Sequence, residues 1–312
     1  MRFVDVKNDV AFRKIFGNEN RTETLISFLN AILDFHGDQR IVEVTILNPY
    51  QLPKLSGGKV TIVDIRATDK AKRTFIIEMQ VADVDGFDKR VLYYAAKSYT
   101  DQIKRADFYR KLKPVIFIGI LDFKFTENES YINRSRVLDV ETGEQTIKDV
   151  EFNYIELPKF NKQLHELKTL TEKWVYFIKN AENLEVIPDD IHDAGLKSAY
   201  EDANMQTWTQ QELDAYDYTF MREEDARARL DKAVMKAVMK AEKLALEKGV
   251  EKGEKIGVKK GEKIGIEKGK IESEKRAVLG MFENGIPVAL IAKSLNLSET
   301  IVEEIIANQR SN

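Results

Sequence analysis

The sequence predicts an α/β protein whose central sheet mixes parallel and antiparallel strands and is flanked by helices. Two short runs with alternating apolar residues, 60–68 and 74–81, enclose a charged turn, which is typical of a hairpin. A helical segment follows at 87–105, and then a continuous apolar run at 114–121, which is typical of a strand covered on both faces. This order of elements indicates an α/β sandwich with a mixed sheet.

Two helices and a strand are expected before the hairpin. Asn8 can cap a short helix over 9–16 that ends at Gly17. A second helix is expected to end at Gly37, and a strand should follow at 41–47. The second helix is marked by apolar residues spaced three and four apart: Leu25, Phe28, Leu29, Ile32 and Leu33.

Two further strands, 135–140 and 150–157, are expected to extend the sheet, and the pattern becomes helical from His165 onward. We therefore predict a core domain over 1–165 and a helical extension over 166–248 that packs on it.

A glycine repeat follows at 249–272, with glycine at every fourth position from Gly249 to Gly269. Each glycine costs a helix about 1 kcal/mol relative to alanine. Small residues four apart also allow two helices to approach closely. Two interpretations of the repeat are therefore open, a flexible charged tether and a helix that self-associates.

The tail, 273–312, is expected to form three short helices. Gly285 should end the first, Pro287 should start the second and Ser298 should cap the third. This layout is similar to a helix-turn-helix, but the third helix is acidic and would repel phosphates. The tail is better interpreted as a bundle that binds a partner or forms a dimer.

Composition excludes several classes of site. The 312 residues carry a formal charge of −3, so any contact with nucleic acid must come from a local basic patch. Cysteine is absent, which excludes thiol nucleophiles, disulfides and thiolate zinc sites, and the three histidines are widely spaced. No apolar run approaches the ~18 residues of a membrane span. We expect a cytoplasmic protein with no membrane segment and no organic cofactor.

Two acids stand out within the hairpin. A hairpin centred on Ala71 places Asp64 directly opposite Glu78. Because strand residues alternate between faces, both acids share one face with Arg66 and Gln80. The other face is apolar and comprises Val63, Ile65, Ala67, Phe75, Ile77, Met79 and Val81. Opposed carboxylates repel, and a divalent cation between them would relieve that repulsion. Alternatively, this is the ordinary polar face of a half-exposed hairpin, on which Arg66 neutralises both acids.

The chain also resembles a known family, the PD-(D/E)XK nuclease-family transposases, which are relatives of the recombination-promoting nucleases. The resemblance spans residues 3–160, and the glycine repeat and tail are similar to the region after the nuclease domain in that family. The matching blocks, in order, are NDVAFRKIFG at 8–17, FLNAIL at 28–33, VDIR at 63–66, IIEMQ at 76–80, and Arg90 with Tyr93 and Tyr94.

The resemblance implies a restriction-endonuclease-like fold and hydrolysis of DNA phosphodiester bonds with Mg²⁺ or Mn²⁺. It implies that the metal is held by Asp64, Glu78 and the backbone carbonyl of Met79. At the third catalytic position the family name expects lysine, whereas this chain has Gln80. Glutamine can orient a water molecule but cannot take its proton, so another group must act as the base.

Supporting residues are expected around this set. Asp9 is either an additional acid near the metal or a charge favoured by the start of its helix. Arg90 and Tyr94 lie four apart on one helical face and are candidates for contact with phosphates, as are Lys14 and Lys97.

The leading hypothesis is a metal-dependent DNA endonuclease connected with mobile elements or recombination. We expect it to act as a homodimer, since cutting both strands of a duplex is most simply done by two active sites. Two alternatives are a nucleic-acid-binding or regulatory protein without turnover, and an oligomeric interaction scaffold.

Overall fold

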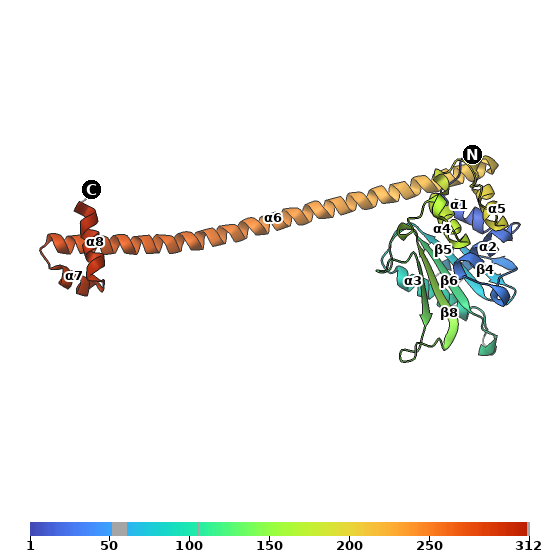
Figure 1. Cartoon of the computed structure of the whole chain (residues 1–312), viewed down its shortest axis with the longest axis horizontal. Coiled ribbons are helices and arrows are strands. Elements are labelled where there is room, and N and C mark those ends of the chain that lie inside the picture. The colour runs from blue at the N-terminus through green and yellow to red at the C-terminus, as the bar shows by residue number, and fades with distance from the viewer. Residues whose placement is uncertain (52–60, 105, 311–312) are drawn as a thin grey trace. The chain divides into compact units, whose positions relative to one another are not determined.

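A six-stranded mixed sheet forms the centre of the first part of the chain (Figure 1). Its spatial order is β1-β4-β5-β6-β8-β7; the two neighbour pairs among β5, β6 and β8 are parallel, and the other three pairs are antiparallel. The strands are β1 (Val44–Leu47), β4 (Ile65–Asp69), β5 (Thr74–Gln80), β6 (Val115–Leu121), β7 (Ile132–Val137) and β8 (Ile147–Glu156). The predicted mixed sheet is confirmed, and so is its extension by two strands after β6.

The computed structural model describes residues 1–51, 61–104 and 106–310. The chain divides into two units, residues 1–225 and residues 226–312. The first unit contains the sheet. The predicted start of the hairpin at Val60 and the predicted helix end at Arg105 lie outside the described residues.

Helices cover both faces of the sheet because alternate strand residues are apolar on both sides. On one face Phe75, Ile77 and Met79 of β5 pack with four helices. On the other face Ile76 packs with Phe87 and other residues of a single helix, α3 (Phe87–Thr100). The four helices on the first face are α1 (Asp9–Phe16), α2 (Thr22–Leu33), α4 (Leu170–Asn180) and α5 (Ala194–Ala203).

The first helix has the predicted ends. The Asn8 side chain accepts hydrogen bonds from the backbone N–H groups of Val10 and Ala11, and α1 ends at Phe16, before Gly17. The second helix ends earlier than predicted. Asp34 adopts a left-handed conformation that ends α2 after Leu33, and Gly37 instead begins a short 3₁₀ helix.

The predicted strand over 60–68 is interrupted at Asp64. Its first part is β3 (Thr61–Ile62), which pairs with β2 (Tyr50–Gln51) in a separate two-stranded sheet. Val63 donates its backbone N–H to Pro49 at 3.2 Å instead of pairing with β5. The Val63 side chain consequently packs on the α3 side of the sheet, so its predicted place on the face of Ile65 was wrong.

Short 3₁₀ helices connect the remaining elements. They are η1 (Gly37–Gln39), η2 (Tyr109–Lys111), η3 (Leu157–Lys159), η4 (Leu164–Glu166), η5 (Ala181–Asn183) and η6 (Met205–Thr207).

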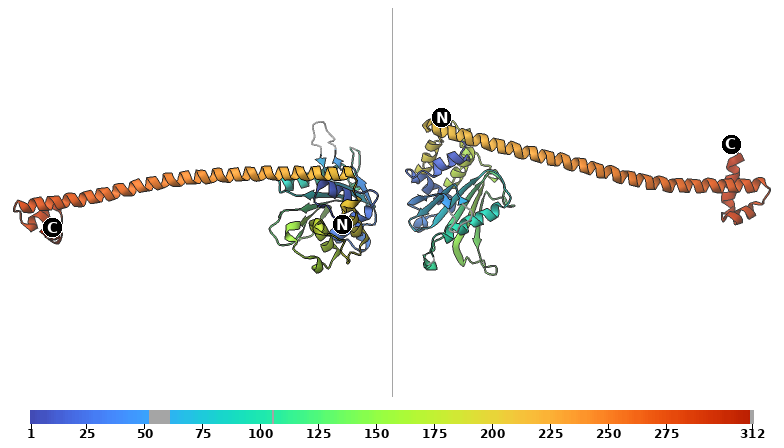
Figure 2. Two further views of the ribbon diagram at one scale, coloured as in Figure 1. Left: turned by 90° about the horizontal axis from the view of Figure 1, so that it is seen from above. Right: turned by 180° about the vertical axis from the view of Figure 1, so that it is seen from behind.

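The second unit contains most of α6 (Gln210–Glu283), followed by α7 (Val288–Leu295) and α8 (Glu299–Arg310). The end of α6 packs with α7 and α8 around Val278, Ile291 and Val302 (Figure 2). Gly285 has a positive φ of 80°, and the Ser298 hydroxyl accepts the N–H of Ile301 at 3.3 Å. The predicted helix-ending and helix-starting residues of the tail are therefore present. The whole glycine repeat lies inside α6. The domain boundaries proposed at 165, 248 and 272 stay predictions.

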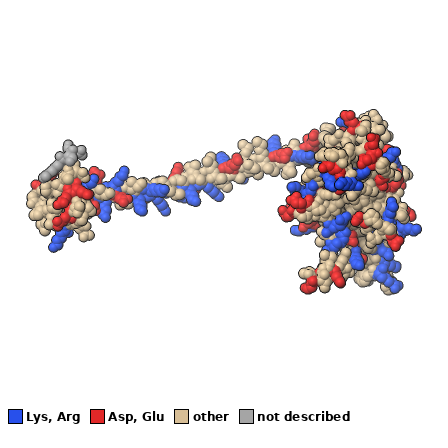
Figure 3. All heavy atoms as spheres, viewed as in Figure 1, with Lys and Arg blue, Asp and Glu red and all other residues tan. Residues whose placement is uncertain are grey.

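Acidic and basic side chains are interspersed on the visible face of the first unit (Figure 3). This distribution accords with a formal charge of only −3. Within the described part of the chain, no helix combines the length and apolarity needed to cross a bilayer.

Candidate metal-binding active site

Asp64 and Glu78 lie side by side at the point where β4 begins. Ile65 pairs with Ile77 in the antiparallel ladder, so the hairpin has the predicted register about Ala71. The Asp64 N–H donates to Oε1 of Glu78 at 3.2 Å, and the Met79 N–H donates to Oδ2 of Asp64 at 2.9 Å. The Asp64 carboxylate is therefore bonded to the backbone of β5, the strand that carries Glu78. The Glu78 carboxylate is bonded to the backbone of Asp64 itself.

The bend at Asp64 explains this arrangement. Since Val63 pairs with Pro49 rather than with β5, the Met79 N–H has no ladder partner from Val63. The Asp64 carboxylate supplies the missing acceptor. In a strand, the N–H and C=O of one residue point to the same side, so the Met79 carbonyl faces the edge occupied by Asp64. Backbone geometry thus groups the two acids with the third predicted ligand.

The face that carries Glu78 is more buried than a half-exposed hairpin would be. Glu78 is only 8% exposed, and the Asp64 side chain only 10%. Helix α3 lies over this face, with its Phe87 and Val91 packed on Ile76. A buried pair of acids has far less water to screen its repulsion than a surface pair has.

Both negative and positive charges act on the acid pair and on Asp9, the positive charges being those of Arg13, Arg90 and Arg222. Burial raises the pKa of Glu78, the charge of Asp64 raises it further, and Arg90 and Arg13 oppose the increase. Burial also raises the pKa of Asp9, and the charge of Asp64 adds to this effect. Asp9 at the start of α1 therefore lies within electrostatic range of Asp64. An additional cation would stabilise the ionised form of these carboxylates.

Arg13 pairs directly with one of these acids. Its Nη2 donates to Oδ1 of Asp64 at 2.9 Å. Burial lowers the pKa of Arg13, but the hydrogen bond and the charges of Asp64, Asp9 and Glu78 raise it by more. Arg13 was not predicted as a site residue, although it lies four positions after Asp9 and so on the same face of α1.

Arg66 does not neutralise the acids, and that expectation was wrong. The acid that influences its pKa is Asp101, and this influence is smaller than the lowering caused by burial. Its Nε is buried without a hydrogen-bond partner among the described residues. Arg66 lies opposite Ile76, two residues before Glu78, so it is displaced along the sheet from the acid pair.

Gln80 and two residues of α3 border the acid pair. The Gln80 Oε1 accepts a hydrogen bond from Nη2 of Arg90, and its Nε2 donates to the carbonyl of Ala82 at 2.9 Å. Burial raises the pKa of Tyr94, and the charge of Glu78 contributes to this effect. Arg90 and Tyr94 therefore both lie within electrostatic range of the acid pair.

The two predicted lysines differ in position. Lys14 forms an ion pair with Glu212, and its ammonium lies 5.1 Å from the ring centroid of Trp208. These contacts direct Lys14 toward the start of α6, whereas its neighbour Arg13 reaches Asp64. Lys97 is half-buried, one turn beyond Tyr94 on α3.

Comparison with protein families agrees with this geometry. A family model described as a PD-(D/E)XK nuclease family transposase matches residues 6–233. The chain belongs to this family. The match extends past residue 160, where the resemblance was expected to end, and includes α4, α5 and the first turns of α6. No curated protein and no solved structure matches the chain.

The donor set of this PD-(D/E)XK protein fits a hard divalent cation. Asp64, Glu78 and the Met79 carbonyl offer oxygen atoms only, which suits Mg²⁺ or Mn²⁺. Among the described residues, no group of three or more His, Cys, Asp or Glu side chains has metal-binding geometry. Mg²⁺ usually retains several waters and takes one or two protein carboxylates, so a pair of acids is a sufficient set.

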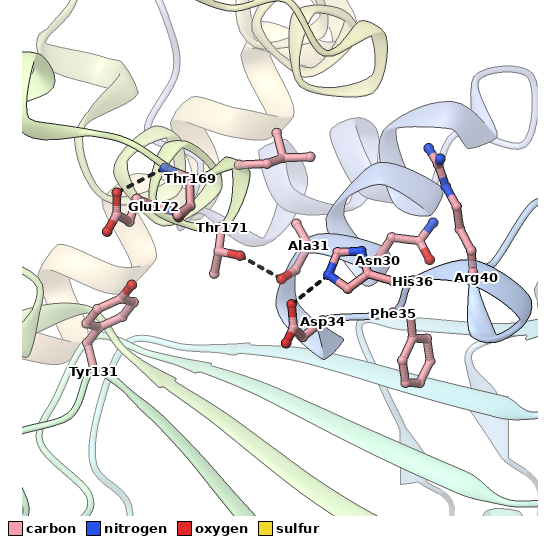
Figure 4. Close-up of a pocket in the computed structure, with 12 residues that line it drawn as sticks. Asn30, Ala31, Asp34, Phe35, His36, Arg40, Tyr131, Thr169, Thr171 and Glu172 are labelled. Atoms are coloured by element: carbon pink, nitrogen blue, oxygen red, sulfur yellow. Dashed lines mark hydrogen bonds and ion pairs between the residues drawn. The ribbon is translucent and has the colours of Figure 1, made fainter.

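A cavity of about 620 Å³ lies elsewhere in the first unit, between α2 and α4 (Figure 4). Its lining includes Asn30, His36 and Tyr131 but neither Asp64 nor Glu78. Polar groups around it pair with one another, as the Thr171 hydroxyl does with the Ala31 carbonyl at 2.7 Å. This cavity is therefore separate from the candidate metal site, which is identified by the chemistry of Asp64 and Glu78.

Proposed function

We propose that the chain is a Mg²⁺-dependent DNA endonuclease that hydrolyses phosphodiester bonds in connection with mobile-element or recombination activity. The observation that supports this most strongly is the position of the two acids. Asp64 and Glu78 are fixed beside each other by hydrogen bonds of 2.9 and 3.2 Å, in a family of PD-(D/E)XK nuclease-type transposases.

In this proposal Asp64, Glu78 and the Met79 carbonyl hold the cation, and Asp9 adds a further negative charge beside it. A bound divalent ion lowers the pKa of its water and neutralises charge on the phosphate in the transition state. The backbone bonds of Asp64 and Glu78 hold their carboxylates in place before the metal binds, which reduces the cost of ordering them.

Gln80 is proposed to orient the attacking water. Its hydrogen bond from Arg90 holds the amide beside Glu78. Because an amide cannot accept the proton at neutral pH, the proton passes to a second water or to a phosphate oxygen of the substrate. Arg90, Tyr94 and Lys97 lie along α3 at helical spacing and are proposed to contact the DNA backbone. Lys14 is not included because its contacts with Glu212 and Trp208 direct it toward the start of α6.

The test is nicking of supercoiled plasmid by the purified full-length protein with Mg²⁺ or Mn²⁺. We expect Asp64→Asn and Glu78→Gln to reduce the rate by about 100-fold or more. The exposed Asp38 provides a matched control, since Asp38→Asn removes one carboxylate of the same kind away from the pair. Equal nicking by wild type and Asp64→Asn would refute the assignment.

A second candidate function is binding or regulation of nucleic acid without turnover. The observation that favours it is Gln80, which stands where the family name expects lysine and whose amide oxygen is engaged by Arg90. DNA binding without nicking, in both wild type and Asp64→Asn, would support this alternative over the endonuclease.

We also propose that the chain acts as a homodimer, and that it does so in the cytoplasm. Cutting both strands of a duplex requires two cleavage events, and two copies of one site related by symmetry provide them most simply. In the interaction-scaffold alternative, α6 would assemble the chain and the acids would have no role in catalysis.

A further inference from the structure

We propose that Arg13 is a built-in counter-ion that releases Asp64 when a divalent cation binds and then contacts a phosphate of the DNA. This inference rests on the proposed function, since it assumes that Asp64 and Glu78 form the metal site. It assigns to Arg13 a role in coupling metal binding to substrate binding.

The position of Arg13 between the acids and solvent supports the first part. Each oxygen of Asp64 accepts one hydrogen bond: Oδ1 accepts from Arg13 at 2.9 Å, and Oδ2 accepts from the Met79 N–H at 2.9 Å. The contact with Met79 is part of the sheet, so it is fixed. The contact with Arg13 is made by a flexible side chain, which can leave without disturbing the backbone.

The two partners differ in mobility. The Arg13 side chain is 49% exposed, whereas that of Asp64 is only 10% exposed. On the same helix Phe12, Ile15 and Phe16 are buried in the core, so the backbone of α1 is fixed. A change at this site is therefore a rotation of the guanidinium into solvent, while Asp64 stays in place.

Charge makes the two cations competitors. Arg13 lies within electrostatic range of Asp64, Asp9 and Glu78, which are the groups that a divalent ion would use. A guanidinium cannot lose its proton in a protein, so a metal ion at Asp64 repels it and competes with it for Oδ1. When the guanidinium leaves Asp64 it returns to water, because 49% of the Arg13 side chain is already exposed, and the metal ion replaces it as the positive charge beside Asp64.

The released guanidinium has a suitable destination. Its planar set of N–H donors matches the oxygens of a phosphate, which are the groups presented by a DNA strand placed over the metal. Arg13 stays on the solvent side of the acid pair because α1 holds its backbone. The same residue would thus weaken metal binding in the absence of DNA and strengthen DNA binding once the metal is present.

The test measures Mn²⁺ binding to the metal-free full-length protein by calorimetry, without DNA. We expect Arg13→Gln to bind Mn²⁺ about five- to tenfold more tightly than wild type, and Arg13→Lys to be intermediate. Lys14→Gln removes one positive charge from the next position of α1, where the partner is Glu212. It should leave Mn²⁺ affinity unchanged, which separates a local effect from a change in net charge.

A second measurement follows DNA binding by fluorescence anisotropy with Ca²⁺ in place of Mg²⁺. Here Arg13→Gln should bind a DNA duplex about five- to tenfold more weakly than wild type. Equal or weaker Mn²⁺ binding by Arg13→Gln, or unchanged DNA binding, would overturn the inference. Absence of Mn²⁺ binding by wild type, or wild-type affinity in Asp64→Asn, would instead refute the proposed metal site itself.

Discussion

Glu78 is buried beside Asp64, and both features raise its pKa. A raised pKa in the folded state means that the folded protein binds this proton more tightly than the unfolded chain does. The resulting stabilisation is present below the unfolded pKa and is lost as pH rises through the raised folded pKa. Without metal, we expect the melting temperature of wild type relative to Glu78→Gln to fall as the pH rises above the ordinary glutamate pKa of about 4.3.

Glu156 provides the matched control for this titration. It too is fully buried, but hydrogen bonds from Lys159 and Thr126 outweigh burial and lower its pKa. The stabilisation from Glu156 is lost only as the pH falls through its lowered folded pKa. The melting temperature of wild type relative to Glu156→Gln should therefore not change over the pH range in which the Glu78 difference falls. Saturating Mg²⁺ should reduce the slope for Glu78, since the metal favours the ionised carboxylate. A flat profile for Glu78 would contradict the raised pKa.

At the residue scale, the sequence predicted the acids better than their surroundings. Alternation and turn length are local, and they placed Asp64 opposite Glu78 correctly. Which basic side chain pairs with Asp64 depends on how α1 packs against the sheet, and no local sequence pattern specifies that packing. Arg66 was therefore proposed as the partner of the acids, whereas the structure has Arg13 in that place. The bend at Asp64 was also missed because it is fixed by side-chain bonds to the backbone.

At the element scale, α5 and α2 make a close contact at Gly195. A Cβ at this position of α5 would overlap the carbonyl of Glu23 and lie 2.5 Å from Cβ of Ser27, both on α2. We expect Gly195→Ala to lower the free energy of unfolding by about 1–3 kcal/mol, because neither neighbour can move without shifting its helix. Chemical denaturation measures this change.

Gly280, in α6 but outside the glycine repeat, is the matched control, since a Cβ there meets no described atom within 4 Å. With no clash to oppose it, the higher helix propensity of alanine should stabilise α6 by about 1 kcal/mol. Circular dichroism should show this as equal or greater helix content. If Gly195→Ala were as stable as wild type, the described contact between α2 and α5 would be incorrect.

Element types were predictable and several of their boundaries were not. Caps and glycines placed the ends of α1 correctly, since these are local hydrogen-bonding signals. The early end of α2 arises from Asp34 in a left-handed conformation, which asparagine or glycine would have indicated more clearly. The covering of the polar face by α3 depends on long-range packing, so the hairpin was expected to be half-exposed.

At the scale of the whole molecule, α6 carries many apolar side chains that are exposed in the single chain. A Cβ added at any of its repeat glycines would also meet no described atom within 4 Å. Exposed apolar surface of this extent is typical of interaction sites. The exposed apolar residues of α6 beyond the first unit are Leu230, Val234, Met235, Val238, Met239, Leu244, Leu246, Val250, Ile256, Val258, Ile264, Ile266 and Ile271.

We therefore expect the full-length protein to be a dimer in multi-angle light scattering, held together partly by α6. A chain that stops at Lys248 should contain fewer copies per particle, because it lacks the glycine repeat and the tail. If the shortened and full-length chains have the same number of copies, self-association through the repeat is excluded.

The sequence left the repeat open between a tether and a helix, and in the structure it is helical. Helix propensity alone could not predict whether the repeat is helical. Six glycines disfavour a helix, and contacts with another helix, which the repeat's own sequence does not specify, could compensate for that cost. The extent of the family region, to residue 233, was not apparent from the motif blocks, which end near Tyr94.

In the proposed function, Asp64 and Glu78 together bind one divalent cation. A crystal of the full-length protein soaked with Mn²⁺ tests this directly, because anomalous scattering locates the metal independently of the protein atoms. We predict one strong anomalous peak in contact with both carboxylates and the Met79 carbonyl, and its loss in Asp64→Asn. A fully soaked crystal with no anomalous peak between these two acids would contradict the proposed metal site.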